Sequence, residues 1–474
     1  MFLDAVLHRN PELVAFATEL HKSGAIPPDT YVMDLDSVES NAALLAQEAD
    51  RLGLSLWFVV KQIGRNPELI EAVARHIPRF AAIDPPEARI LHAAGAEAGN
   101  LGHLVQIPAR ALPEMLAWRP ETVTVYDLAN ARAVSEAATR LGFVQDVLIR
   151  LEGAPGSVYP GQEGGVRLDG SVRRDSGVRV EDGRLLGGGG GRLPDGTGPD
   201  GGGPLADSVR LDGGGGDGPR ADGMRPEGGL RLDGGAQLGA AVGLDADAGL
   251  DAGIGLDADG GLDAFLDEAE RLPGIRVAGV TAFPCVLCDP ETGVPQPTPN
   301  FALARRAVER LAARGHTDLK LSAPSATSMA TLPLLARLGA THGEPGHALT
   351  GTTPLHAVDY EQPERPAYVY VSEVAHTLAD GRPALYGGGF YARGGAREAL
   401  IPRTGARLRV EDAPAANIDY YRLLAPGDAR VGDTAVLAFR TQIFVTRSTV
   451  AVVSGLSSGR PKLSGLYDPL GRPY

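Results

Sequence analysis

Short apolar runs alternate with helical stretches through residues 57–344, and this alternation constrains the fold more than any other feature. Eight runs have the length and apolar character of buried strands: 57–60, 80–83, 103–106, 123–126, 147–151, 277–283, 319–322 and 341–344. Stretches with helical character lie between them: 66–75, 86–94, 109–117, 130–141, 262–272, 302–313 and 328–338. The chain is therefore predicted to be α/β, with a (β/α)8 TIM-type barrel.

A long Gly/Asp-rich, low-complexity insertion, assigned to residues 168–262, separates the fifth strand from the sixth. Residues 161–261 hold 33 of the 63 glycines, and residues 160–264 contain no aromatic, lysine, histidine or cysteine. Such a segment buries too little apolar surface to offset the entropy of ordering, so we expect a flexible excursion on a βα loop. Calcium-binding solenoid repeats are a weaker alternative, because the Gly-Leu-Asp-Ala near-repeat lacks a fixed nine-residue period.

The pattern changes near residue 360 to short, β-branched or aromatic runs at 368–371, 406–410, 434–439, 444–446 and 450–453. These predict a C-terminal all-β domain over residues 361–474. The barrel is then assigned to residues 1–167 and 263–360. Residues 30–36 form a further strand ahead of the barrel, which we expect to pair with the C-terminal domain.

Charge and cysteine usage exclude several classes of partner. The net charge of −14 argues against a nucleic-acid partner. No basic-then-apolar leader and no long apolar span is visible, so we expect a cytoplasmic protein with no membrane partner. Cys285 and Cys288 form one C-x-x-C pair, which cannot fill a four-ligand zinc site, and no metal site is predicted. Both are interpreted as ordinary thiols.

Lys61 stands directly after the apolar run 56–60, and it is one of only four lysines beside 41 arginines. Retention of a lysine at this place suggests chemistry that a guanidinium cannot perform, because an ε-amine can lose its proton and form a Schiff base. A lysine at a strand end that holds its ammonium in water is the alternative.

Polar residues also mark the ends of other predicted strands, where a barrel carries its active site. His103 lies on the third run, Ser325 follows the seventh and Glu344 ends the eighth, before Gly346 and His347. Serine and backbone N–H groups can bind phosphate, and a carboxylate can bind a protonated pyridine nitrogen. Together with Lys61 they predict a pyridoxal phosphate site. A core histidine, a helix-capping serine and a Glu-Pro-Gly turn are the structural alternatives.

Several longer motifs make this sequence similar to a known family. They are residues 31–41, 58–67, 102–108, 159–163, 323–328, 344–351, 387–391 and 439–447. The chain resembles the alanine racemase-like, fold type III pyridoxal phosphate enzymes, and within them the YhfX family. The resemblance covers nearly the whole chain except about residues 168–262. It implies a barrel followed by a β-domain, normally assembled as a head-to-tail homodimer with shared active sites.

The resemblance also assigns roles to individual residues. Lys61 matches the Schiff-base lysine, and Ser325 matches the phosphate-binding serine. Arg65 stands where racemases carry a phosphate-contacting tyrosine, which makes it a candidate phosphate ligand. Tyr391 resembles the second catalytic base, supplied by the partner subunit. The expected cofactor-binding residues are Lys61, Arg65, His103, Ser325, Thr327, Glu344, Gly346 and His347, and the expected catalytic residues are Lys61 and Tyr391.

Two departures from racemases leave the reaction open. Glu344 replaces an arginine at the pyridine nitrogen and resembles the glutamate motif of fold type III decarboxylases. Ala282 replaces a histidine expected beside the cofactor ring. The sequence therefore predicts a pyridoxal phosphate enzyme acting at the α-carbon of an amino acid, with racemisation first. A decarboxylase or other lyase is the alternative, and a non-catalytic cofactor-binding protein is a third.

Overall fold

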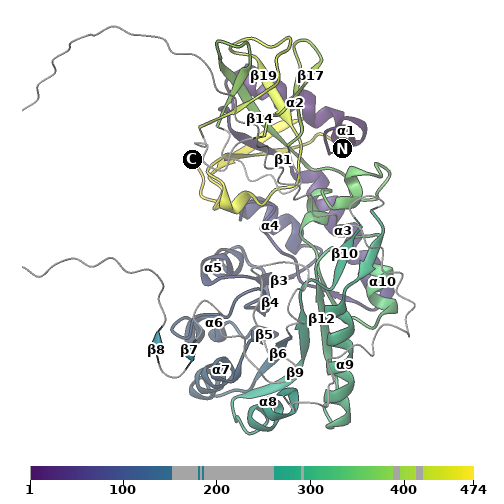
Figure 1. The fold of residues 1–474 in the computed structure, drawn as a ribbon, viewed down its shortest axis with the longest axis vertical. Helices are drawn as coiled ribbons and strands as arrows, with labels where there is room; N and C mark the ends of the chain where they lie inside the picture. Colours follow the sequence, from purple (N-terminus) through teal and green to yellow (C-terminus); the bar gives the residue numbers. More distant parts are fainter. Residues whose placement is uncertain are drawn as a thin grey trace, which may run out of the picture. The chain divides into compact units, whose positions relative to one another are not determined.

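Eight parallel strands form a nearly closed barrel in the order β2-β13-β12-β9-β6-β5-β4-β3 (Figure 1). Phe58 closes it through a bridge to Phe80 of β3, because the Phe58 N–H donates to the Arg79 carbonyl and the Ala81 N–H donates to the Phe58 carbonyl, both at 2.9 Å. The strands are β2 (Ser55–Leu56), β3 (Arg79–Ala82), β4 (Glu97–Leu101), β5 (Thr122–Val125), β6 (Gln145–Leu151), β9 (Ile275–Ala282), β12 (Lys320–Pro324) and β13 (His342–Glu344). The predicted barrel is confirmed.

This computed structural model describes residues 2–151, 261–289, 293–387, 396–412 and 420–474, together with the backbone of 180–181 and 184–185. Nearly all of the predicted insertion lies outside the described residues. The exceptions are residues 261 and 262 at the start of α8 and a short antiparallel hairpin, β7 (Val180–Glu181) with β8 (Arg184–Leu185). None of the described helices is long and apolar enough to span a membrane.

Helices cover the outside of the barrel strands, and several begin on a side-chain cap (Figure 1). Asn66, Asp84 and Asp127 each accept a hydrogen bond from a backbone N–H in the first turn of the helix that follows. These caps turn the chain from a strand end into a helix. The helices are α4 (Pro67–Ala74), α5 (Pro85–Ala93), α6 (Leu112–Ala117), α7 (Leu128–Arg140), α8 (Gly261–Ala269), α9 (Pro299–Ala313) and α10 (Leu332–Arg337).

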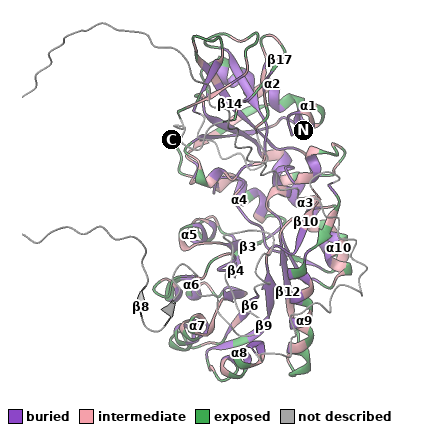
Figure 2. Cartoon of the chain, in the orientation of Figure 1, coloured by how far each residue is buried: buried purple, intermediate pink, exposed green. Residues whose placement is uncertain are grey.

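Burial follows the layers of the barrel, with the strands buried and the outer faces of the helices exposed (Figure 2). One apolar cluster joins the strands to the surrounding helices. A smaller one, made by Trp57, Val59, Ala81 and Leu148, contains side chains of β3, β6 and the segment after β2. Packing on both faces explains why the barrel strands read as continuous apolar runs.

A nine-stranded sheet forms the β-domain, with β1 (Thr30–Asp34) in its interior. Strand β1 pairs antiparallel with β14 and parallel with β20, which confirms that residues 30–34 join the C-terminal domain. Helices α1 (Phe2–Arg9) and α2 (Pro11–Lys22) pack on this sheet, and α3 (Leu35–Leu52) leads to the barrel. The remaining strands are β14 (Tyr368–Thr377), β15 (Pro383–Tyr386), β16 (Glu398–Ile401), β17 (Ala406–Arg409), β18 (Tyr421–Leu423), β19 (Thr434–Leu437), β20 (Thr449–Ser454) and β21 (Lys462–Tyr467).

Three predicted strands differ from the structure. The first barrel strand is 55–56 and not 57–60, where only Phe58 makes a β-bridge. The third barrel strand is 97–101 and not 103–106, because Gly102 adopts φ +83° and ends the extended segment, so His103 lies in the loop after the strand. Residues 443–445 form a 3₁₀ turn, η3 (Ile443–Val445), instead of the strand predicted at 444–446. There the Thr446 backbone N–H and hydroxyl both donate to the Ile443 carbonyl, at 2.9 and 2.8 Å, which favours the turn.

Candidate functional site

A cavity of about 550 Å³ lies at the carboxyl ends of the barrel strands. Most of the sequence-predicted site residues line it: Lys61, His103, Ser325, Thr327, Glu344, Gly346 and His347. The β-domain contributes Arg440, Gln442 and Phe444, and the hairpin of β10 (Val286–Cys288) with β11 (Pro295–Pro297) contributes the Cys288 thiol side chain. The fold thus brings together groups that lie up to several hundred residues apart in the chain.

Glu344 is held in a fixed orientation at the end of β13. The Ser322 hydroxyl donates to Oε1 at 3.1 Å, and the Glu344 backbone N–H donates to the Thr327 hydroxyl at 2.9 Å. Nδ1 of His103 contacts Oε2, and the two side chains are only 4% and 1% exposed. Thr327 therefore tethers the loop after β12 to the end of β13, and the carboxylate is buried and oriented at the cavity wall.

Ser325 occupies a turn with unusual backbone geometry. It has φ +101° and the next residue, Ala326, has φ +50°. The Ser325 hydroxyl donates to the Val286 carbonyl at 2.9 Å and accepts from the backbone N–H groups of Cys285 and Val286 at 2.9 and 3.0 Å. This hydroxyl holds β10 against the turn. Consecutive residues with such backbone angles can form a concave nest of N–H groups that suits an anion.

The backbone at Gly346 lies close to the Gln62 side chain, and a residue with a Cβ atom would not fit there. A Cβ atom placed there would lie 2.6 Å from Oε1 of Gln62, which is the residue after Lys61. The Gln62 side chain lines the cavity and is 4% exposed, and its Oε1 has no hydrogen-bond partner among the described residues. The glycine and the glutamine therefore form a tight polar corner beside the lysine.

Lys61 sits in a turn that follows β2 and the Phe58 bridge. The Ile63 backbone N–H donates to the Val60 carbonyl at 3.1 Å, and Gly64 has φ +66° with Ile443 of the β-domain packed against its Cα. The positive charge of Lys61 lowers the pKa of His103, although burial is the main cause of that lowering and Glu344 opposes it. The Lys61 charge thus acts on His103 within the cavity.

Arg65 is not brought into the cavity lining. Its Nη2 lies 3.1 Å from Asp84 Oδ2 and 3.3 Å from Glu87 Oε2, and its guanidinium lies 5.0 Å from the ring centre of Phe444. It instead ties the Lys61 loop to the start of α5. Tyr391 lies outside the described residues. Ala282 is fully buried at the end of β9, where the sequence comparison expects a histidine.

Sequence reasoning missed Arg150, which lies on β6. The residue is 3% exposed, and its Nε and Nη1 have no hydrogen-bond partner within the described ranges. Its guanidinium carbon lies 5.9 Å from the ring centre of Phe283, a cavity residue, and its charge lowers the pKa of His103. The sequence signal for it was an arginine inside the apolar run 147–151, because charged side chains are rarely fully buried unless they have a partner.

The barrel, the following β-domain and the lysine-bearing cavity together define an alanine racemase-like protein. The family model described as alanine racemase, N-terminal domain, matches residues 33–153, and the model described as YhfX-like, C-terminal domain, matches residues 369–463. The chain is 34% identical over 478 residues to the uncharacterized protein YhfX of Escherichia coli (strain K12), with 99% of each chain covered. It belongs to the YhfX family.

Solved structures with this fold belong to proteins of different activities. D-threo-3-hydroxyaspartate dehydratase from Delftia sp. HT23 has a TM-score of 0.55 at 16% identity, covering 92% of this chain and 96% of that chain. D-threonine aldolase from Filomicrobium marinum has a TM-score of 0.54 at 14% identity, covering 94% and 95%. Alanine racemase from Clostridium difficile 630 has a TM-score of 0.51 at 13% identity, covering 94% and 99%. At these identities the likeness establishes the fold alone.

Proposed function

We propose that this protein is a pyridoxal phosphate-dependent enzyme that acts at the α-carbon of an amino acid, and that the reaction is racemisation. One observation carries the proposal: a lysine, a buried carboxylate and a turn of positive-φ residues meet in one cavity at the carboxyl ends of the barrel strands. An active site occupies this position in barrel enzymes generally. The family assignment supports the same reading.

The chemistry of the lining suits this cofactor. Its phosphate would be bound at the turn of Ser325 and Ala326 and beside Gly346, where the small residue leaves room. The Gln62 amide, turned to present its NH2 group, would donate to the same anion. Glu344 would accept a hydrogen bond from the ring nitrogen. Arg150, whose Nε and Nη1 have no hydrogen-bond partner among the described residues, suits an anionic oxygen of the cofactor or substrate.

Bound pyridoxal phosphate supplies an electron sink that lowers the barrier to breaking a bond at the α-carbon. The residues of this chain do the rest. Lys61 Nζ would bind the cofactor covalently and then carry the α-proton on one side of the substrate. Tyr391 of the partner subunit would carry it on the other side, with Arg393 and Arg397 as the candidate cations that would favour its phenolate. We accordingly propose a cytoplasmic homodimer with shared sites.

A decarboxylase or lyase is the second candidate, and Glu344 is the observation that favours it. A carboxylate beside the ring nitrogen keeps that nitrogen protonated, which strengthens the electron sink and supports bond breaking beyond proton exchange. The dehydratase and the aldolase among the structural neighbours share the fold with this chain. A cofactor-binding protein without turnover is the third candidate, because Ala282 removes a ring-stacking group.

The deciding experiment starts with the absorbance of the purified protein after incubation with pyridoxal phosphate. We expect a visible band in the wild type and in the surface variant Lys22→Ala, and its loss in Lys61→Ala. Borohydride reduction should attach the cofactor to the peptide that contains Lys61. Absence of that modification would refute the proposal. In heavy water, α-deuteration with loss of optical rotation indicates racemisation, and release of carbon dioxide indicates decarboxylation. A cofactor band without any change in the amino acids tested indicates a non-catalytic protein.

A further inference from the structure

His103 and Glu344 meet across the barrel although their strands are not neighbours. His103 follows β4 and Glu344 ends β13, and the strand order places β3 and β2 between them. Nδ1 of His103 contacts Oε2 of Glu344, with both side chains almost fully buried. Phe283 packs edge-on against the imidazole, with 6.2 Å between ring centres. This contact is made inside the cavity wall and not on the protein surface.

The surroundings of His103 favour a neutral imidazole. Three charged groups face it: Glu344, Lys61 and Arg150. Burial lowers the pKa of His103 most, the two cations lower it further, and Glu344 raises it only in part. A carboxylate accepts hydrogen bonds but does not donate them, so a neutral imidazole in contact with it must carry its hydrogen on Nδ1. His103 thus offers Glu344 a donor without adding a net charge.

The Glu344 carboxylate is therefore held from two sides. The Ser322 hydroxyl, on the adjacent strand β12, donates to Oε1 at 3.1 Å, and His103 contacts Oε2 from across the barrel. Each carboxylate oxygen can accept a second hydrogen bond, so both remain able to meet a further donor. A carboxylate held in this way cannot rotate freely when a ligand approaches.

We propose that His103 is a positioning residue that holds the Glu344 carboxylate aimed at the cofactor's ring nitrogen, and that it thereby sets the protonation of that nitrogen. This inference rests on the proposed function, since it assumes that pyridoxal phosphate binds in the cavity. It assigns a purpose to a buried histidine that the proposed proton transfers do not use. A neighbouring strand could have supplied a purely structural partner for Glu344, whereas His103 reaches it from across the barrel.

The test compares two substitutions in the cofactor-loaded protein. His103→Leu removes the donor, whereas His103→Asn keeps an N–H group at the position of Nδ1. We expect the leucine variant to bind pyridoxal phosphate about tenfold more weakly, which corresponds to one hydrogen bond to a charged group. We also expect the absorbance of its bound cofactor to shift toward that of the form with an unprotonated ring nitrogen. The asparagine variant should restore both the affinity and the spectrum.

A double-mutant cycle separates this role from simple packing. If His103 acts through Glu344, then His103→Leu should change neither the spectrum nor the affinity further in a Glu344→Gln background. A full additional effect in that background, or an asparagine variant that behaves like leucine, overturns the proposal. Urea unfolding of the cofactor-free variants shows which are folded, and His103→Gln replaces the leucine variant if leucine prevents folding. Failure of the wild type to form the Lys61 adduct contradicts the proposed function itself.

Discussion

Arg65 and Glu87 form a buried ion pair directly beside the Lys61 loop, with 3.3 Å between Nη2 of the arginine and Oε2 of the glutamate. The two side chains are 6% and 0% exposed. Burial raises the pKa of Glu87, and the charges of Arg65 and Lys61 offset this in part. The pair links the loop after the first barrel strand to the first turn of α5, so it controls where Lys61 sits.

Arg65→Met should destabilise the cofactor-free protein by about 3–5 kcal/mol, because it leaves the Glu87 carboxylate buried without its partner. Urea unfolding measures this loss. The matched control is Arg75→Met, which breaks a half-exposed pair with Glu39 and should cost about 1 kcal/mol or less. An unchanged stability of the cofactor-free Arg65→Met protein, with a loss of phosphate affinity alone, would instead support the role predicted from the family resemblance.

Gly346→Ala should disrupt the polar corner beside Lys61. The new methyl group would lie 2.6 Å from Oε1 of Gln62, a buried side chain with little room to move. Overpacking of this kind costs about 1–3 kcal/mol, and we expect that loss in the cofactor-free protein together with weaker pyridoxal phosphate binding. The double variant Gly346→Ala, Gln62→Ala should regain the stability, because the shorter side chain makes room. Additive losses in the double variant would contradict this account.

The barrel and much of the cavity were predictable from local sequence because continuous apolar runs and capped helices leave few alternatives. Lys61 follows the apolar run 56–60 and Glu344 ends the apolar run 341–344, and these positions alone predict that both lie at the carboxyl end of the barrel. The His103 error arose because the apolar residues 104–105 resemble a strand, whereas the backbone of Gly102 ends the real one. The pattern of apolar residues in a sequence does not show that a glycine adopts a positive φ, such as the +83° of Gly102.

Contacts between distant segments were not predictable. Arg440, Gln442 and Phe444 reach the cavity because the β-domain folds against the barrel, and no spacing in the sequence encodes that approach. The Ser325 hydroxyl was expected to bind phosphate, yet in the structure its hydrogen-bond partners are Cys285 and Val286. The hydrogen-bond partner of a hydroxyl group depends on the tertiary structure, which forms only when the strands have packed.

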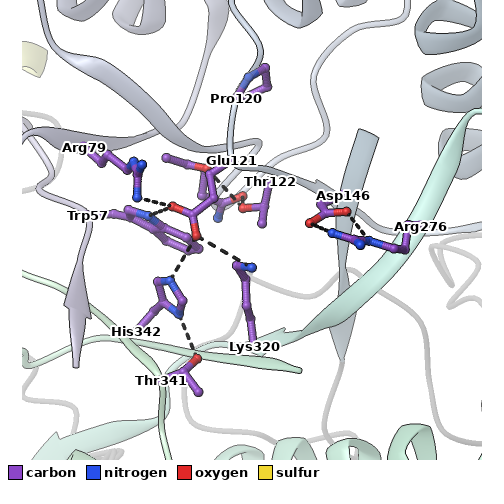
Figure 3. A network of polar contacts seen from close by, with 12 residues as sticks. Trp57, Arg79, Pro120, Glu121, Thr122, Asp146, Arg276, Lys320, Thr341 and His342 are labelled. Atoms are coloured by element: carbon purple, nitrogen blue, oxygen red, sulfur yellow. Dashed lines mark hydrogen bonds and ion pairs between the residues drawn. The ribbon is translucent and has the colours of Figure 1, made fainter. Parts of the chain in front are cut away.

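Glu121→Gln should weaken the opposite end of the barrel. Glu121 accepts from Trp57 Nε1 at 3.1 Å and lies 3.3 Å from Arg79 Nη1, 3.4 Å from His342 Nε2 and 3.8 Å from Lys320 Nζ (Figure 3). The amide keeps an acceptor for the indole but removes the charge, so we expect a loss of roughly 1–3 kcal/mol. Urea unfolding measures it, and the cofactor spectrum should not change.

Asp146→Asn is the control for Glu121, because Asp146 pairs with Arg276, which is 70% exposed (Figure 3). Because the cation of this pair is exposed, the pair should be worth about 1 kcal/mol or less. Burial acts to raise the pKa of Glu121, but His342, Trp57 and Arg79 outweigh it and lower the pKa below the ordinary 4.5. The charged contribution is therefore present above pH 4.5 and is lost as the pH falls through the lower folded value. Equal losses in the two variants would argue against a buried network.

His356 should make the protein sensitive to acid. It is 2% exposed, its Nδ1 accepts from the Thr353 hydroxyl at 2.8 Å, and its Nε2 donates to the Glu364 carbonyl at 3.0 Å. Burial lowers the pKa of His356 from 6.5 to about 4. The unfolded chain therefore takes up a proton before the folded protein does. Stability from this group is complete above pH 6.5 and is lost between pH 6.5 and about 4, by about 3 kcal/mol.

His356→Gln should flatten that acid limb, because an amide keeps a donor near the Nε2 position but does not titrate. The measurement is the free energy of unfolding in urea at several pH values between 4 and 7.5 (a range chosen to bracket roughly both pKa values). Burial raises the pKa of the neighbouring Glu364, which works in the opposite direction but is common to both proteins. His8→Gln, at an exposed position, should leave the slope as in the wild type. A wild-type slope in His356→Gln would show that other groups cause the acid sensitivity.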